Sequence, residues 1–536
     1  MTDIPEAPVS KIPRASVPPA LGSWKSQAFA VVICATLFVL AFPDYDVDLL
    51  VWVCLVPLFF VTRGVGGKRG FLLGWLTGFL IEGVGFFWIL HAILNFTNLP
   101  FFVGFLIFLA WDAFSSLSWA ILGWLLGRCR TPVLAHVAIA VWVAVECYFP
   151  RVFDWQIGGA LYQRDWLRQA ADIFGAHGLS YVILLANVLV YLLIEWRLKR
   201  VAFPRGTFVV VSAIAIALPS YGFWRLGDLR TELEDVPTLK VAMIQPMTEP
   251  REAVNVVNLF RGQLRQTLDL AAENGADLGL WPEGADPYPF SVVSGQDPLL
   301  HHRSAADAPS IFDAASFPLV VGGTSFDEND RPFNTAAYIL PSGEQVDGAR
   351  VHLYHKNRLL VFGEKLPLQD FYPDWILDRI SVRTIGAGTE NPLLTLKART
   401  AGAGQEFPFR NLICYEAVLP GYVRESSDGA DFLVNLTEDI WYGKTAHISQ
   451  HASVLRMRGV ETRTPILRCT NVGPSGVIDV TGEFSPSSAV FSPDAKLFHF
   501  RPGSPSSFYV QIGFLFPLFL LLGALPLFVR RIVKGS

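Results

Sequence analysis

Cys414 is the residue of this chain whose setting most strongly suggests chemistry. It ends an apolar, strand-like run, Asn411-Leu-Ile-Cys414, and is followed at once by Tyr415 and Glu416. A cysteine attacks a carbonyl group as its thiolate. Because a free thiol has a pKa of about 8.5, the reaction at neutral pH needs a nearby base or cation. The candidate partners are therefore charged residues that, like Cys414, directly follow or flank strand-like runs.

Three charged residues upstream occupy such positions, in the motifs Trp281-Pro-Glu283, Tyr354-His-Lys356 and Phe362-Gly-Glu364. A glutamate can take the thiol proton, and a lysine can favour the thiolate and stabilise an oxyanion. Glu364 could hold the lysine or share the role of base. The plain alternative is a cysteine that packs in the core, with charged residues in ordinary loops. Positions at strand ends favour catalysis, because active sites of α/β folds collect there.

The region 236–503 that contains these motifs has ordinary polar content and predicts one α/β domain. Short apolar runs read as buried strands and alternate with helical patterns, which indicates sheets covered by helices. Helices are predicted over 253–274 and 446–461. Strands are predicted over 241–245, 278–281, 318–323, 336–340, 411–414, 432–437, 466–471 and 477–480.

The rest of the chain is dominated by apolar runs. Of 536 residues, 51% are hydrophobic and only 17% are charged, where a soluble protein carries about 25%. Eight runs suggest membrane spans, although the first two are short for a span of about 20 residues. Seven lie in a membrane domain at 28–230, behind an N-terminal segment at 1–27, and the eighth is assigned to 508–530. The runs are 28–42, 49–62, 71–92, 101–127, 132–149, 179–196, 206–224 and 508–529.

Lys and Arg in the loops predict the orientation. One side carries fifteen, whereas the alternate loops 43–48 and 93–100 carry none and 150–178 carries three. The positive-inside rule then places both termini in the cytoplasm and 236–503 outside it. A net charge of −4 gives no indication of nucleic-acid binding. Six widely spaced cysteines without a C-x-x-C pair indicate neither a zinc site nor a disulfide framework.

Other candidate residues have a functional and a structural interpretation. Glu82, Asp112 and Glu146 interrupt spans, where a carboxyl is costly and suggests function, unless it lies at a helix interface. His447 and His451 have the spacing of zinc ligands, but the H-E-x-x-H context and an evident third ligand are missing, which favours a structural role. Trp441 and Tyr442 are typical of a site wall or lid.

With these motifs in view, Glu283, Lys356 and Cys414 resemble the Glu-Lys-Cys pattern of the nitrilase, or carbon–nitrogen hydrolase, superfamily. The eight apolar runs, with the α/β region inserted before the last, are similar to the apolipoprotein N-acyltransferase family. The resemblance implies eight transmembrane helices and a four-layer αββα sandwich. Further blocks that fit are Asn435-Leu-Thr-Glu-Asp439, Trp441-Tyr-Gly443, Gln450-His451, Arg458-x-x-Glu461 and Asn471-x-Gly473.

The resemblance also implies a reaction. Cys414 would take an acyl chain from a phospholipid as a thioester and pass it to the N-terminal amine of a diacylglyceryl-cysteine apolipoprotein. Glu283 would be the base, and Lys356 with the Tyr415 N–H would bind the oxyanion. Supporting residues would be Glu364, Tyr415, Glu416, Trp441 and Tyr442. No cofactor or metal is expected. A monomer is expected in the bacterial inner membrane, with its catalytic domain in the periplasm.

Departures from the family pattern leave alternatives open. Val361 stands where a proline is usual, the stretch 245–251 lacks an aromatic residue, and 153–159 replaces a Gly-Phe-Pro-Trp run. These changes put acceptor recognition in question. One alternative is a membrane-tethered amidase of the nitrilase type that uses water as acceptor. Another is an inactive lipid-binding sensor or transporter, against which an intact set of Glu283, Lys356 and Cys414 argues.

Overall fold

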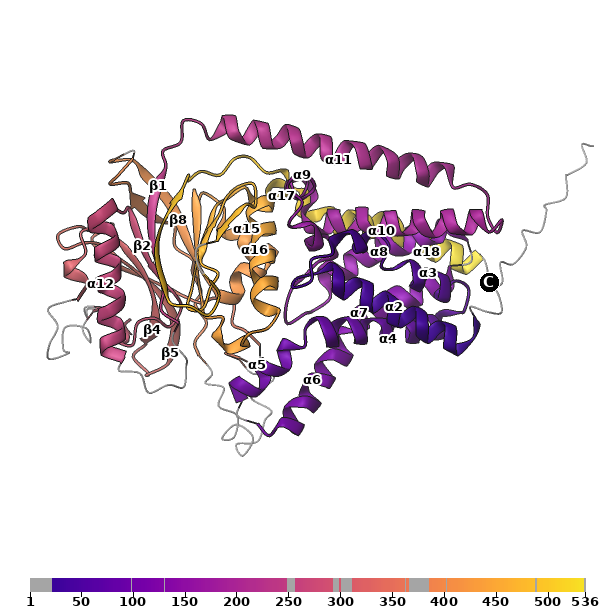
Figure 1. Ribbon diagram of the computed structural model, residues 1–536, viewed down its shortest axis with the longest axis horizontal. Helices are drawn as coiled ribbons and strands as arrows, with labels where there is room; N and C mark the ends of the chain where they lie inside the picture. Colours follow the sequence, from indigo (N-terminus) through magenta and orange to yellow (C-terminus); the bar gives the residue numbers. More distant parts are fainter. Residues whose placement is uncertain are drawn as a thin grey trace, which may run out of the picture.

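The chain folds into a helical part and an α/β part that lie end to end (Figure 1). The computed structural model describes residues 22–97, 99–129, 131–247, 256–292, 298–299, 311–361, 363–365, 385–401, 403–486 and 489–534.

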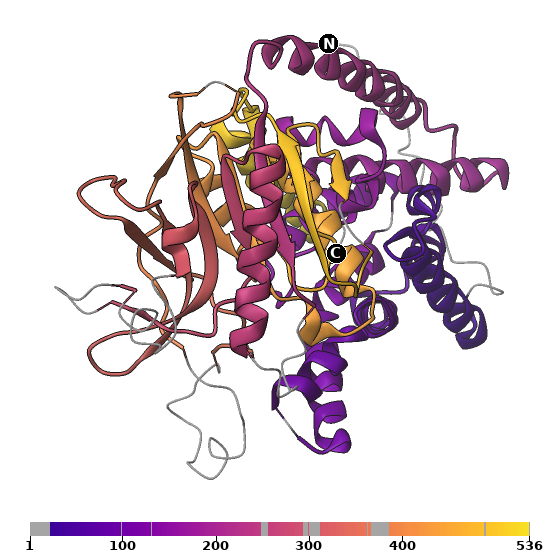
Figure 2. The same cartoon turned by 60° about the vertical axis from the view of Figure 1, so that its left-hand side comes forward.

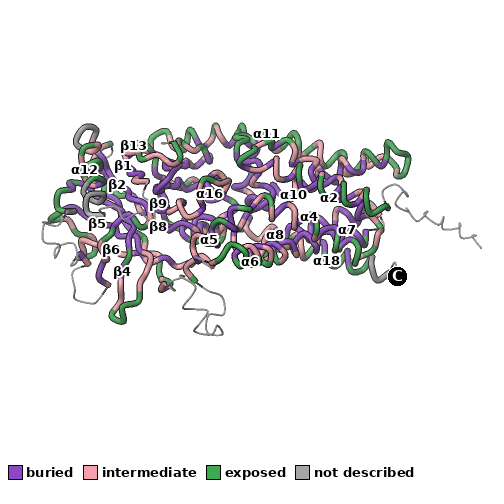
Figure 3. The backbone as a smooth tube through the Cα atoms, turned by 60° about the horizontal axis from the view of Figure 1, so that its bottom comes forward, coloured by how far each residue is buried: buried purple, intermediate pink, exposed green. Residues whose placement is uncertain are grey.

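All eight predicted apolar runs are helical. Among the described residues, five helical stretches are long and apolar enough to cross a membrane: Trp24–Ala41, Phe101–Arg128, Ala171–Arg197, Arg205–Glu232 and Gly513–Arg530. The pair Gly67–Gly85 and Trp88–Thr97, bent by 62°, could form a sixth span, and Asp48–Thr62 and Leu134–Tyr148 are shorter apolar helices. The exposed faces of the outer helices, α11 (Arg205–Glu232) above all, suit contact with lipid (Figure 3).

The helical part consists of these elements: α2 (Trp24–Ala41), η1 (Asp48–Trp52), α3 (Val56–Thr62), α4 (Gly67–Gly85), α5 (Trp88–Thr97), α6 (Phe101–Ser115), α7 (Leu117–Arg128), α8 (Pro132–Tyr148), η2 (Ile157–Leu161), α9 (Asp165–Arg168), α10 (Ala171–Arg197), α11 (Arg205–Glu232), α17 (Phe508–Gln511), η7 (Gly513–Leu515) and α18 (Phe516–Lys534).

The carboxyl groups within the spans are buried at helix contacts. Glu82 accepts a hydrogen bond of 3.2 Å from Trp119 Nε1. Glu146 accepts one of 2.8 Å from the Ile157 N–H, and its second oxygen lies 3.0 Å from His177 Nδ1. These contacts fit the structural interpretation of Glu82 and Glu146, since a buried polar group is tolerated where it finds a partner.

The α/β part is a sandwich of two mixed sheets. One has the strand order β13-β1-β2-β4-β5-β6, with β3 beside β4, and the other has the order β12-β11-β10-β9-β8-β7. The elements are β1 (Leu239–Gln245), α12 (Val256–Asn274), β2 (Leu278–Trp281), β3 (Phe290–Ser291), η3 (Ile311–Ala314), β4 (Leu319–Phe326), β5 (Pro332–Ile339), β6 (Val351–His355), β7 (Leu394–Lys397), β8 (Glu406–Ile413), η5 (Cys414–Val418), α15 (Pro420–Ser426), β9 (Phe432–Thr437), η6 (Ile440–Tyr442), α16 (His447–Thr462), β10 (Ile466–Thr470), β11 (Gly476–Ile478), β12 (Phe484–Pro486) and β13 (Asp494–Phe500).

Three apolar layers hold this sandwich together and confirm the predicted αββα arrangement. Val241, Phe409 and Val434 lie in the layer between the sheets. Leu264 and Leu268 of α12 cover the outer face of the first sheet, while residues of α15 and α16 cover the second. Figures 1 and 2 show α12 on the face of the sandwich away from the membrane helices, and α16 on the face toward them.

The α/β part is anchored to the helices by buried polar contacts. Arg463, at the end of α16, forms an ion pair of 2.7 Å with Asp172 of α10, which Arg225 of α11 also contacts at 3.2 Å. Gln450 of α16 accepts a hydrogen bond of 2.9 Å from Trp88 Nε1 at the start of α5. The position of α16, and of the strands behind it, is therefore fixed relative to the helices.

Candidate active site

Cys414 occupies a strained turn at the end of a central strand. The strand predicted over 411–414 ends at Ile413 in the structure, as β8. Cys414 begins the short helix η5 with a φ of +50°. A residue with a side chain rarely adopts this left-handed conformation, and such strain persists only where the surroundings enforce it. The cysteine is 7% exposed. This sharp turn separates the thiol from the strand ladder and is a suitable position for a nucleophile.

Lys356 lies between two carboxylates. Its Nζ is 2.8 Å from Glu364 Oε1 and 3.5 Å from Glu283 Oε1, and its side chain is 1% exposed. Asn334 donates to both carboxylates, at 2.6 Å to Glu283 and 3.0 Å to Glu364. Glu364 thus holds the lysine, as one of the sequence interpretations proposed. Asn334 was missed, although its place next to an apolar strand run was a possible signal. Phe362 lies outside the described residues.

The electrostatics of the site favour a neutral thiol at rest. Burial raises the pKa of Cys414 well above its usual value; Glu283 adds to this and Lys356 opposes it. Burial also raises the pKa of Glu283, against the attraction of Lys356. For Lys356 burial alone would lower the pKa, but Glu364 and Glu283 outweigh it and raise the pKa. The arrangement thus pairs a thiol with a strengthened base and a permanently charged cation.

Glu416 ties the strand that carries the nucleophile to the loop that carries the lysine. Its Oε2 accepts hydrogen bonds from the Ile413 N–H at 2.7 Å and the Tyr354 hydroxyl at 2.6 Å. Its Oε1 accepts from the N–H groups of Asn357, at 2.6 Å, and Arg358, at 2.9 Å. Because its contacts are with residues adjoining Cys414 and Lys356, Glu416 is a positioning residue.

Aromatic residues connect the site to the membrane helices. Trp441 stacks on Phe96 of α5 with ring centroids 5.1 Å apart, and its backbone carbonyl accepts a hydrogen bond of 2.8 Å from Asn95. Tyr442 is buried and stacks on His447 at 3.5 Å. Tyr415 packs against the apolar cluster that runs through the helical part. Trp441 therefore joins the segment after β9 to α5, and the site wall expected of Trp441 and Tyr442 stays a prediction.

Asp439 lies beside His447 and His451 as a third potential metal ligand, which the sequence did not indicate. A carboxylate oxygen of Asp439 and ring nitrogens of both histidines lie within 4.8 Å of one another, which is compatible with metal ligation. Asp439 also forms a buried ion pair with Arg468. The guanidinium of Arg468, paired with this carboxylate, balances its negative charge and repels a metal cation. These contacts support the structural interpretation of the histidines.

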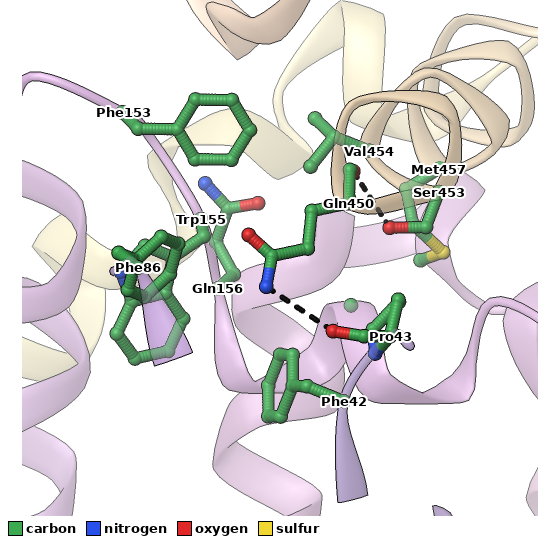
Figure 4. Close-up of a pocket in the computed structure, with 11 residues that line it drawn as sticks. Phe42, Pro43, Phe86, Phe153, Trp155, Gln156, Gln450, Ser453, Val454 and Met457 are labelled. Atoms are coloured by element: carbon green, nitrogen blue, oxygen red, sulfur yellow. Dashed lines mark hydrogen bonds between the residues drawn. The ribbon is translucent and has the colours of Figure 1, made fainter. Parts of the chain in front are cut away.

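A small pocket adjoins the junction of the two parts. Gln450 enters it from α16 and donates to the Pro43 carbonyl at 3.1 Å (Figure 4). Aromatic residues line much of it, including Phe86, Phe153 and Trp155. Cys414, Glu283 and Lys356 are not among its lining residues, so its position suits anchoring of the two parts rather than chemistry.

The layered sheets and apolar helices define a membrane protein with a carbon–nitrogen hydrolase-type domain. The Carbon-nitrogen hydrolase family model matches residues 240–503, and the model of the Apolipoprotein N-acyltransferase N-terminal domain matches 34–189. Together they match most of the chain. The protein belongs to the apolipoprotein N-acyltransferase family.

Curated relatives agree over nearly the full length. The chain is 27% identical to the Apolipoprotein N-acyltransferase of Geobacter metallireducens, covering 92% of this chain and 93% of that protein. It is 28% identical to that of Bdellovibrio bacteriovorus, with 86% of each covered. Among solved structures, a carbon-nitrogen hydrolase from Helicobacter pylori matches with a TM-score of 0.34 and 13% identity, over 49% of this chain and 89% of that one.

Proposed function

We propose that the protein transfers an acyl chain from a phospholipid, through a thioester on Cys414, to the N-terminal amine of a diacylglyceryl-cysteine apolipoprotein. The observation that carries the proposal is the cluster of Lys356, Glu283 and Glu364, whose charges act on the thiol of Cys414 at a strained turn. The names of the relatives support lipoprotein N-acylation.

In the first half-reaction Glu283 takes the thiol proton and Cys414 attacks the ester carbonyl. Lys356 and the Tyr415 N–H stabilise the oxyanion that forms. Collapse of the tetrahedral intermediate breaks the ester bond, and Glu283 returns the proton to the leaving lysophospholipid alkoxide. The product thioester keeps the acyl group reactive, so an amine can be acylated without a further energy source.

In the second half-reaction the acceptor amine attacks the thioester. Glu283 removes a proton from the nitrogen as the C–N bond forms and delivers it to the departing Cys414 thiolate. An amide is formed and the thiol is restored. No step requires a cofactor, and a monomer supplies every group in this scheme.

We further propose that residues 236–503 lie on the periplasmic side of the inner membrane, with both termini in the cytoplasm. Basic residues of separate loops lie close together: Arg63 and Arg200 both form ion pairs with Glu195, Arg200 at 3.1 Å. The closeness of these two loop cations, which the positive-inside count assigns to the same side, supports the proposed orientation of 28–230 and 508–530.

A labelled phospholipid tests the proposal. The purified protein should acquire an acyl adduct that maps to Cys414, is cleaved by hydroxylamine, and is absent from Cys414→Ala. A diacylglyceryl peptide with a free amine should then discharge the adduct as an amide. An undiminished adduct in Cys414→Ala would refute the role of this cysteine, and discharge by water at the same rate without peptide would favour an amidase.

A further inference from the structure

Acylation of an ammonium group by a thioester releases two protons, and the scheme above assigns an acceptor to only one of them. An α-amino group has a pKa of about 7.7–8.0, so near neutral pH much of the acceptor arrives as ammonium, which cannot attack a carbonyl. The ammonium must lose one proton before attack and a second as the amide forms. Glu283 passes the second proton to the Cys414 thiolate, and the first needs another acceptor.

Glu438 lies beside Glu283 and offers a carboxyl group for this proton. Its backbone N–H donates to Glu283 Oε2 at 2.8 Å. A Cβ atom added at Gly284, the residue after the base, would lie 3.5 Å from Glu438 Oε2. The side-chain carboxyl therefore lies against the chain that carries the base. The residue is only partly buried, so a substrate group can approach it.

The partners of Glu438 differ from those of the other two carboxylates. Lys356 forms ion pairs with Glu283 and Glu364, whereas Glu438 Oε2 accepts a hydrogen bond of 2.9 Å from the neutral indole Nε1 of Trp441. Among the described residues no cation forms an ion pair with Glu438, so an ammonium that arrives beside it would favour its ionised form. Burial, and then the nearby Glu283, raise the pKa of Glu438 to about 8, close to that of an α-ammonium group.

We propose that Glu438 binds the α-ammonium group of the acceptor and takes its first proton before the amine attacks the acyl-Cys414 thioester. This inference rests on the proposed function and identifies how the second substrate is recognised. The ammonium N–H bond breaks and Glu438 becomes a carboxylic acid. The free amine then attacks, Glu283 transfers the second proton to sulfur, and Glu438 finally releases its proton to water.

Glu438→Gln distinguishes a role in binding and deprotonating the acceptor ammonium from a purely structural role of Glu438. Glutamine keeps the backbone N–H to Glu283 and an oxygen for Trp441, but it cannot neutralise or deprotonate an ammonium. Glu406→Gln, on an exposed part of β8, is the matched control. Each protein is loaded with a labelled acyl chain, freed of donor, and discharged with a diacylglyceryl peptide or with hydroxylamine, a nucleophile that is neutral at pH 7.

At pH 7 the peptide should discharge Glu438→Gln about six- to elevenfold more slowly than wild type, because only the free-amine fraction of the acceptor can react with the variant. This deficit should shrink as the free-amine fraction rises, and the rate should approach wild type above the amine's pKa. Hydroxylamine should discharge both proteins alike, and Glu406→Gln should match wild type throughout.

Equal peptide discharge by wild type and Glu438→Gln across this pH range would overturn the inference. Equal slowing with hydroxylamine would also overturn it, because that result indicates a merely structural role. If wild type forms no adduct on Cys414, the proposed function fails, and this inference fails with it.

Discussion

Replacing Glu416 by glutamine should leave one backbone donor of the site, the Ile413 N–H, without an acceptor. The carboxylate accepts from the N–H groups of Asn357 and Arg358 on one oxygen, and from Ile413 N–H and the Tyr354 hydroxyl on the other. A glutamine keeps its oxygen where two backbone donors meet and presents its NH₂ group to the other side. The Tyr354 hydroxyl can rotate to accept from this group, but Ile413 N–H cannot.

The expected loss of stability follows from the one hydrogen bond that the Ile413 N–H loses. A buried N–H left without a partner costs about 1–3 kcal/mol, and each kcal/mol lowers the Tm of a domain of this size by about 2–4 °C. Ile413 immediately precedes Cys414, whose φ of +50° needs support from its surroundings. A displacement of the thiol by about 1 Å can slow chemistry on the order of 10²-fold.

Two assays in detergent measure these effects: the thermal unfolding midpoint and the initial rate of acyl-adduct formation on Cys414. Glu425→Gln is the matched control, since Glu425 lies on the next helix with its side chain 58% exposed. The control should leave both quantities unchanged. A Glu416→Gln protein that unfolds and loads like wild type would refute the view that this carboxylate fixes the turn.

Three further changes test other contacts of the structure. Glu364→Gln replaces a charged hydrogen bond of buried Lys356 and leaves Glu283 as its one carboxylate, so unfolding free energy should fall by about 1.5–3 kcal/mol; denaturant titration and the adduct assay check this, and an unchanged midpoint would contradict it. Gln450→Leu removes hydrogen bonds to Trp88, Pro43 and Gly85, so stability should fall by about 3 kcal/mol at about 1 kcal/mol each; a Tm equal to wild type would show that α16 is anchored elsewhere. Because burial raises the pKa of Cys414, iodoacetamide labelling of its peptide should keep rising about tenfold per pH unit beyond pH 8.5, where an ordinary thiol levels off; a plateau near pH 7 would indicate a preformed thiolate.

Much of the sandwich was accessible to sequence reasoning because its central strands are continuous apolar runs. Residues 432–437 and 466–470 are buried along their whole length, and such runs between helical patterns predict covered parallel strands. The edge strand β7 alternates buried and more exposed residues, and in β13 Asp, Lys and His interrupt the apolar residues, so no continuous apolar run marked them. Cys414 was placed at a strand end, although its left-handed backbone gave no signal in the residue pattern.

The partners of the charged residues could not be predicted in the same way. Asn334 reaches Glu283 and Glu364 only because β5 pairs with β4 and β6 in the first sheet. Asp439 meets Arg468 because β9 and β10 pair in parallel. These contacts depend on strand register, which short sequence motifs do not encode. The motif residues were thus visible in sequence, while the polar groups that orient them were not.

The site depends on both sheets of the sandwich, and this explains why its parts are so strongly constrained. Glu283 follows β2 and Lys356 follows β6 in the first sheet, whereas Cys414 follows β8 in the second. Links that cross between the sheets at the site include those from Glu416 to the backbone beside Lys356 and from the backbone of Glu438 to Glu283. A small slide of one sheet over the other would therefore break these links together and separate the thiol from its base and its cation. A close-packed layer between sheets resists such a slide, so the apolar core that stabilises the fold also maintains the geometry on which the proposed acyl transfer depends.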